Sequence, residues 1–145
     1  MGAMEIMNDT QWRDFVSEGT RTGKLATVRE DGRPHIAPVW FVLDGDDVVF
    51  NTGRGTVKGR NLRRPGARAA LCVDDDRPPF SFVVVEGAVT VSEEPGELVR
   101  WATAIGGRYM GEERAEEFGR RNGVPGELLV RVHVDKVIAQ RDLAD

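Results

Sequence analysis

Apolar and polar positions in the first half of the chain predict one helix followed by three strands. The helix begins at Asp9 or Thr10, either of which can cap it, and ends near Ser17, with Trp12 and Val16 on its apolar stripe. The next apolar runs are separated by turns that contain Asp-Gly, which favours hairpins. The strands predicted from these runs are Lys24–Arg29, Pro34–Leu43 and Val48–Thr52.

The second half predicts a short helix, further strands and a pair of helices. Val57–Arg64 is predicted as a helix that Pro65-Gly66 ends. Within the long apolar strand Phe80–Val91, Glu86-Gly87 indicates a bulge, and Gly106-Gly107 is expected to separate the last two helices. Those helices are Glu93–Arg108 and Gly111–Asn122, and the remaining strands are Ala67–Val73 and Leu128–Val134, which Val137–Gln140 extends.

These elements predict a single, mainly β domain with flanking helices over residues 9–145, after a tag remnant and N-terminal tail in residues 1–8. A chain of 145 residues suffices for one hydrophobic core. Six or so strands that are joined by hairpins and apolar on both faces favour a closed barrel over an open sheet. Strand–helix–strand alternation does not run through the chain, which argues against a Rossmann fold.

The predicted strand Pro34–Leu43 is apolar on both of its faces. Such a strand needs a second partner surface, which is either another subunit or a planar ligand. Because Pro38 cannot donate to a ladder, we expect the strand to be interrupted there or to lie at an edge of the sheet. One face carries Ile36, Pro38, Trp40 and Val42, and the other carries Ala37, Val39, Phe41 and Leu43.

The distribution of charge matters more than its total. A net charge of −4 argues against binding to nucleic acid or a membrane surface, and the single Cys72 favours a reducing, cytoplasmic setting. The stretch Asn51–Val73, however, contains six basic residues and no acid, whereas the rest of the chain has 14 basic and 24 acidic residues. Either a local anion site or a solvated helix face accounts for this island.

The segment Asn51–Asn61 lies between a predicted strand and a predicted helix, where backbone N–H groups and the helix dipole favour a phosphate. Thr56 is placed to cap the helix, and Lys58 and Asn61 share one face beside that end. The glycine spacing matches neither a Walker A loop nor the G-x-G-x-x-G fingerprint. The segment therefore predicts an anion site without naming the anion.

No residue is predicted to be catalytic, and the two histidines and one cysteine argue against a zinc site. His35 is expected to be a surface or hydrogen-bonded residue, His133 an outward-facing strand residue and Cys72 an inert core thiol. The lack of an evident general acid or base suits an enzyme whose chemistry resides in a cofactor.

A family resemblance rests on four segments in a fixed order, which are Gly32–His35, Pro38–Phe41, Thr56–Pro65 and Val85–Gly87. Together they resemble the pyridoxamine-phosphate-oxidase-like split β-barrel proteins, most closely the actinobacterial reductases that depend on coenzyme F-420, a deazaflavin. The resemblance implies a six-stranded split barrel and a homodimer with cofactor sites at its interface. It also implies hydride transfer from the reduced deazaflavin to an activated double bond of a small organic acceptor.

By the same resemblance, Thr56, Lys58 and Asn61 contact the cofactor phosphate, while Arg54 and Arg60 reach its anionic tail. F-420 carries a phosphodiester and an oligoglutamate tail, so a run of arginines suits it better than it suits one compact phosphate. Residues 38–41 are expected along the ring system. The predicted cofactor-binding residues are Pro38, Val39, Trp40, Phe41, Thr52, Arg54, Thr56, Val57, Lys58, Arg60 and Asn61.

Three alternatives remain open at this point. The first is FMN bound in the same fold by an oxidase or reductase. The second is a non-enzymatic flavin or haem binder, with His35 as the axial ligand. The third is a dimeric scaffold that uses Trp40 and Phe41 for assembly alone. For the enzyme, the resemblance implies that either Phe80 and Phe82 or Arg108 and Tyr109 of the partner chain close the pocket.

Overall fold

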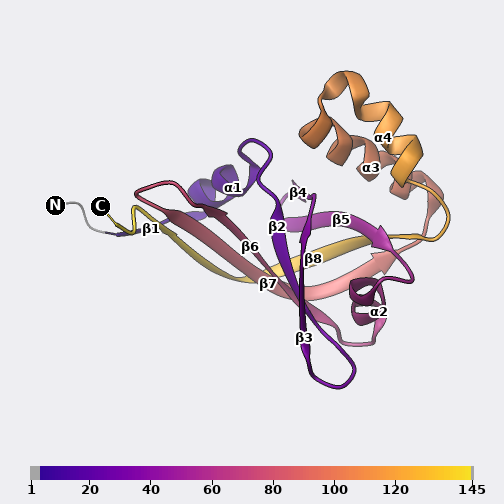
Figure 1. The fold of residues 1–145 in the computed structure, drawn as a ribbon, viewed down its shortest axis with the longest axis horizontal. Coiled ribbons are helices and arrows are strands. Elements are labelled where there is room, and N and C mark those ends of the chain that lie inside the picture. Colours follow the sequence, from indigo (N-terminus) through magenta and orange to yellow (C-terminus); the bar gives the residue numbers. More distant parts are fainter. Residues whose placement is uncertain (1–3, 145) are drawn as a thin grey trace.

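A computed structural model describes residues 4–144 and forms one long, bent sheet with helices at its ends (Figure 1). None of the helices in that part of the chain is long and apolar enough to cross a membrane. The elements, in chain order, are β1 (Glu5–Ile6), α1 (Asp9–Ser17), β2 (Gly23–Val28), β3 (Pro34–Val39), β4 (Val42–Asp44), β5 (Asp47–Gly53), α2 (Val57–Arg63), β6 (Arg68–Asp75), β7 (Ser81–Ser92), α3 (Pro95–Met110), the 3-10 turn η1 (Glu112–Arg114), α4 (Ala115–Asn122) and β8 (Glu127–Arg141).

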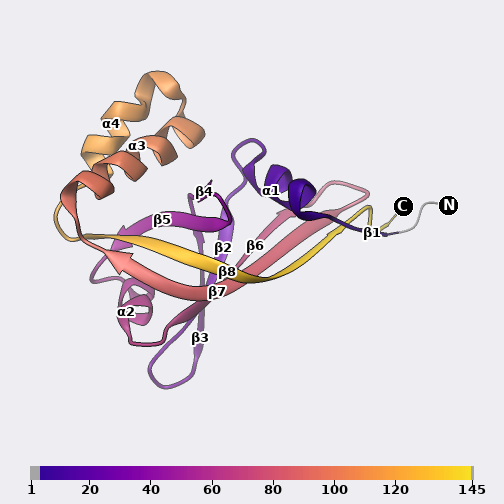
Figure 2. The same ribbon diagram turned by 180° about the vertical axis from the view of Figure 1, so that it is seen from behind.

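All strands belong to one antiparallel sheet in the order β3-β2-β6-β7-β8-β5-β4, with β1 added on β8. The terminal strands β3 and β4 do not pair with each other, so the barrel is split between them. Strands β2 and β3 run steeply across the direction of β7 and β8 (Figures 1 and 2). The mainly β class with flanking helices is confirmed. The sheet has eight strands, of which β1 and β4 are short, and it does not close, so the prediction of a closed barrel of about six strands is wrong.

Alternate residues of the long strands face one hydrophobic core. Helix α1 closes one side of this core with Trp12 and Val16, each only 2% exposed. Burying one such large apolar side chain contributes about 1.5–3 kcal/mol. The fully buried strand residues include Leu25, Phe50, Leu71, Val83 and Val130.

Helix α3 stands on β4, β5 and β8 at one end of the sheet, and α4 packs on α3 (Figure 1). The prediction that Gly106-Gly107 separates them is wrong, because both glycines lie inside α3. A Cβ atom at Gly106 would meet the Cβ of Phe118 at 2.5 Å, so glycine here serves close helix packing. The helix ends instead at Gly111, whose φ of 97° favours glycine.

The N-terminal segment contributes to the fold from Glu5 onward. Residues 1–3 of the predicted tail lie outside the described residues, but Glu5–Ile6 pair with β8 and Met7 is buried. The cap of α1 is Asn8, not Asp9 or Thr10 as predicted. Its side chain accepts from the Gln11 backbone at 2.8 Å, and the Gln11 side chain accepts from the Asn8 backbone at 2.9 Å. This reciprocal capping box satisfies two donors, which a cap one residue later would not.

The predicted strand Pro34–Leu43 is two strands, because Trp40 and Phe41 leave the ladder between β3 and β4. Pro38 itself lies within β3, an edge strand of the sheet, so the edge position expected for it is confirmed. The bulge is confirmed as well, since the β7–β8 register shifts between Glu86 and Gly87. The two segments predicted at the C-terminus form the single strand β8.

Candidate cofactor site

A broad hollow of about 910 Å³ lies between the β2–β3 hairpin and helix α2. Backbone hydrogen bonds close the hairpin between Arg29 and Arg33, which brings both of these residues to its tip. We call the cavity the arginine hollow because arginines stand on both of its walls. Its lining residues are Arg29, Glu30, Asp31, Arg33, Val57, Arg60, Asn61, Arg63, Arg64 and Pro65.

The arginine hollow has a net positive charge, because five arginines line it against the two acids Glu30 and Asp31. Of its five arginines, only Arg33 forms an ion pair among the described residues, with Nε 2.8 Å from Oδ2 of Asp31. The Arg33 backbone N–H, which donates to Oδ1 of Asp31 at 3.1 Å, and the Arg33 side chain both lower the pKa of Asp31. The other four guanidiniums donate only to uncharged oxygens, namely Arg29 to Pro34 O (2.6 Å), Arg60 to Gly55 O (2.6 Å), Arg63 to Arg54 O (3.3 Å), and Arg64 to Val28 O and to Asn61 Oδ1 (3.2 Å). Charge-assisted bonds to a polyanion are stronger than these contacts.

Thr56 caps α2, as predicted. Its Oγ1 accepts a hydrogen bond from the Gly59 backbone at 3.0 Å and donates to the Gly53 carbonyl at 2.8 Å. The hydroxyl of Thr52 lies 3.2 Å from Oγ1 of Thr56. The Thr56 hydroxyl is therefore engaged in the loop, and its effect on a nearby anion is to fix the start of α2.

Lys58 and Asn61 differ in how far they are engaged. The Asn61 side chain is 5% exposed, and its Nδ2 donates to Oγ1 of Thr27 in β2 at 3.0 Å. Its Oδ1 accepts from Arg64, so both ends of the amide are used. Lys58 is half-buried, and its side chain forms no hydrogen bond or ion pair among residues 4–144. Of the three residues predicted to contact a phosphate, Lys58 has the most freedom to bind one.

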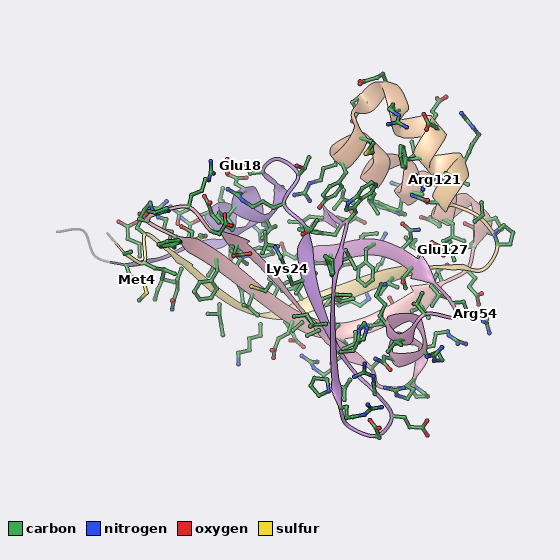
Figure 3. The ribbon with its side chains drawn as sticks, viewed as in Figure 1. Met4, Glu18, Lys24, Arg54, Arg121 and Glu127 are labelled. Atoms are coloured by element: carbon green, nitrogen blue, oxygen red, sulfur yellow. The ribbon has the colours of Figure 1, made fainter. Side chains whose placement is uncertain are left out.

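Arg54, predicted to reach the anionic tail, is held by a carboxylate. One of its Nη atoms lies 2.7 and 2.8 Å from the two oxygens of Glu93. Its backbone N–H donates to Gly126 at 2.8 Å, so the loop before α2 is tied to the chain just before β8. Figure 3 shows Arg54 beside α2, at the same end of the molecule as Glu127. Arg54 and Glu93 are both about half exposed, which leaves the pair open to competition.

The segment Pro38–Phe41 does not line the arginine hollow. Val39 and Phe41 point into the core with exposed fractions of 7% and 0%, whereas Pro38 is exposed. Trp40 stacks on Tyr109 of α3 with ring centroids 5.1 Å apart and planes 2° from parallel. A ring system next to this segment would therefore meet mainly its backbone.

Sequence reasoning missed Arg29 and Arg33 as residues of the site. They flank the predicted hairpin turn, far from α2 in the sequence, and only the tertiary fold brings the two segments together. Their position beside an Asp-Gly turn is a hairpin signal and carries no information about a binding partner.

The histidines and the cysteine lie outside the arginine hollow. Nδ1 of His35 is buried without a hydrogen-bond partner in the described structure. His133 lies 3.2 Å from Asp47 and 2.8 Å from Thr90 through its two ring nitrogens, on the outer face of the sheet. The three side chains Asp47, His133 and Thr90 form a hydrogen-bonded row, but none of them lines a hollow described for residues 4–144. Cys72 is half-buried, and burial raises the pKa of its thiol.

Comparison with known proteins defines the class. The pyridoxamine 5'-phosphate oxidase family model matches residues 9–141, so the chain belongs to that family. A 5a,11a-dehydrotetracycline/5a,11a-dehydrooxytetracycline reductase of Streptomyces rimosus is 30% identical over 132 residues, covering 81% of this chain and 85% of its own.

Two solved structures extend this likeness. A conserved hypothetical protein, Rv2991 of Mycobacterium tuberculosis, has a TM-score of 0.81 at 28% identity, covering 94% of this chain and 88% of its own. An F-420 reductase has a TM-score of 0.66 at 25% identity, covering 86% of this chain and 94% of its own. The family resemblance drawn from the four sequence segments is thereby confirmed.

Proposed function

We propose that this protein is an oxidoreductase that uses coenzyme F-420 to reduce an activated double bond of a small organic acceptor. The observation that carries the proposal is the arginine hollow, where four guanidiniums without a carboxylate partner adjoin the helix that bears Lys58. F-420 presents a phosphodiester and a line of carboxylates, whereas FMN presents one compact phosphate. Two of the similar proteins are named as reductases, one of them for F-420, which supports the same choice.

In this proposal, the basic residues divide the anionic groups between them. Lys58 holds the phosphodiester, and Arg60, Arg63 and the hairpin arginines take the acidic tail. Each shielded, charge-assisted hydrogen bond contributes about 1.5–3 kcal/mol. Asn61 acts indirectly, because its amide joins α2 to β2 and so sets where Lys58 stands.

The chemistry itself is supplied by the deazaflavin, which carries a transferable hydride at C5 when bound in its reduced form. The chain holds the ring and the acceptor in contact and keeps water away from them. We assign the ring to the backbone of Pro38–Phe41, since the side chains of Val39 and Phe41 are committed to the core. We propose an acceptor with an activated double bond because one similar protein is named as a dehydrotetracycline reductase. We place the reaction in the cytoplasm, where the lone Cys72 would stay reduced.

We further propose that the protein is a homodimer with the cofactor at its interface. The face of the sheet opposite the core carries exposed apolar side chains on β2, β3 and β8, and an isologous contact between two copies would cover them. Ile36 is 69% exposed there, Val28 is 55% exposed, and Ile138 is 42% exposed. Register places Ile138 beside Val84 on the same face.

The proposed activity is tested by following the oxidation of reduced F-420, through its visible absorption, with a panel of enone and quinone acceptors. We expect a rate that is proportional to protein concentration for at least one acceptor. At subsaturating cofactor, Lys58→Ala should slow that rate. A rate no greater than that of the protein-free reaction with every acceptor would contradict the proposal.

A further inference from the structure

The corner between β3 and β4 takes its hydrogen bonds from a helix instead of a strand. Trp40 and Phe41 lie outside the ladder, so their backbone groups need other partners. The last turn of α3 provides them for Phe41. Its carbonyl accepts from Nη1 of Arg108 at 2.7 Å, and its N–H donates to the hydroxyl of Tyr109 at 3.3 Å. Two consecutive residues thus hold both sides of one residue of the corner.

Arg108 also joins this corner to the end of α1. Its Nη2 donates to Val16 O at 2.7 Å and its Nε to Gly19 O at 3.0 Å. The guanidinium lies over the Phe41 ring, 4.7 Å from the centroid, and pairs with no carboxylate among residues 4–144. Partial burial lowers the pKa of Arg108, because the charged guanidinium loses part of its contact with water. This half-buried cation therefore holds three carbonyl groups, two at the end of α1 and one in the corner.

Tyr109 fixes the other half of the corner. Its hydroxyl donates to Arg21 O at 2.8 Å while accepting from Phe41. Its ring lies parallel to that of Trp40, and Phe118 of α4 packs against the same indole with centroids 5.9 Å apart. Trp40 therefore has a fixed ring orientation and Phe41 a fixed peptide. The partner-chain role expected for Arg108 and Tyr109 stays a prediction, and in this chain both side chains are engaged with their own corner.

We infer that Arg108 and Tyr109 are positioning residues that fix the Trp40–Phe41 corner as the surface on which the cofactor ring is seated. The inference rests on the proposed function. It divides the site into two parts with different roles. The arginine hollow and Lys58 determine how tightly the cofactor binds, and the Trp40–Phe41 corner determines how its ring is oriented.

Two conservative variants test this division. Tyr109→Phe keeps the ring that stacks on Trp40 and removes only the hydroxyl, and Arg108→Lys keeps the charge but cannot reach three carbonyls at once. Arg100→Lys is the control, since Arg100 lies on the same helix over Trp101 but is exposed. The readouts are hydrogen exchange of the Phe41 amide by NMR, the dissociation constant for F-420 and the induced circular dichroism of the bound deazaflavin.

We expect Phe41 exchange to accelerate about tenfold in Tyr109→Phe, the equivalent of one lost hydrogen bond. The induced dichroism of F-420 should fall in both α3-terminus variants, whereas its dissociation constant should change less than in Lys58→Ala. The control should leave all three readouts unchanged. Unchanged exchange and dichroism in both variants would overturn the inference. If the wild-type protein binds neither F-420 nor FMN, the proposed function fails. Phe41 exchange then still shows whether Arg108 and Tyr109 hold the Phe41 backbone in place.

Discussion

At the level of single residues, the basic stretch separates into cations that are paired and cations that are not. Arg54 and Arg68 form exposed ion pairs with Glu93 and Asp135, both at 2.7 Å. Exposed pairs of this kind contribute about 0–1 kcal/mol and are weakened by salt. Lys58 has no such partner among the described residues. The capacity to bind an anion therefore lies on α2, and the paired cations stabilise the chain around it.

Replacement of Lys58 by alanine tests the phosphate assignment. We expect Lys58→Ala to weaken F-420 binding by about 1.5–3 kcal/mol, because it removes a charged hydrogen bond in a partly shielded position. Fluorescence titration measures the dissociation constant. Arg120→Ala, which removes an exposed cation on α4, away from the arginine hollow and from the sheet face proposed for dimerisation, is the control and should bind as the wild type does. A folded Lys58→Ala protein with an unchanged dissociation constant would refute the assignment.

Asp75 gives a prediction for the pH dependence of stability. Hydrogen bonds from the side chain and backbone of Arg77, with Arg21 nearby, lower its pKa from 3.8 to about 2. A carboxyl whose folded pKa is depressed adds stability that is present above its unfolded pKa and is lost as the pH falls through the folded pKa. Asp75→Asn should therefore melt below the wild type near neutral pH, and the gap should close as the pH falls from 3.8 to about 2. A gap that stays constant in thermal unfolding over this range, or an equal gap in Asp76→Asn, would contradict the account.

At the level of elements, the site depends on how closely α2 approaches the loop before it. A Cβ atom at Gly59 would stand 2.2 Å from the Gly53 carbonyl oxygen, a backbone atom that cannot move aside cheaply. The same approach lets Thr56 cap the helix with one hydroxyl. Glycine at position 59 is thus what allows the cap, the loop and Lys58 to occupy one small region.

We expect Gly59→Ala to lower the free energy of unfolding by about 1–3 kcal/mol through overpacking. Urea denaturation measures the change. Gly55→Ala, in the loop just before α2, is the control, because a Cβ there meets nothing within 4 Å. Equal stability of the two variants would show that the close approach of α2 is not required.

At the level of the whole molecule, the features that could be predicted from the sequence are those that depend on neighbouring residues, such as strands, turns and helix caps. Alternation and Asp-Gly turns predicted most strands, and Thr56 was predicted as the cap of α2 from its own neighbours. The arginine hollow could not be predicted, because the Arg29–Arg33 hairpin meets α2 only after β2 and β3 have joined the sheet. The break at Trp40 also depends on a distant partner, the end of α3.

The exposed apolar face of the sheet gives a prediction about assembly. Ile36→Lys should shift the protein toward monomer in sedimentation velocity, since it places a charge in the contact between copies that we propose. Val99→Lys replaces an equally apolar, 41% exposed residue on α3 and should leave the dimer intact. A wild-type protein that is monomeric at every concentration would exclude this assembly, as would an Ile36→Lys dimer of undiminished affinity.

The proposed cofactor is best tested by comparing F-420 with FMN as ligands of the wild-type protein and of the double variant Arg60→Gln, Arg63→Gln. Both arginines face the arginine hollow and pair with no carboxylate among the described residues. We expect the wild type to prefer F-420. In the variant, F-420 binding should weaken about tenfold or more, while FMN binding stays the same, because FMN lacks the acidic tail. Tight FMN binding with negligible affinity for F-420 would contradict the proposal.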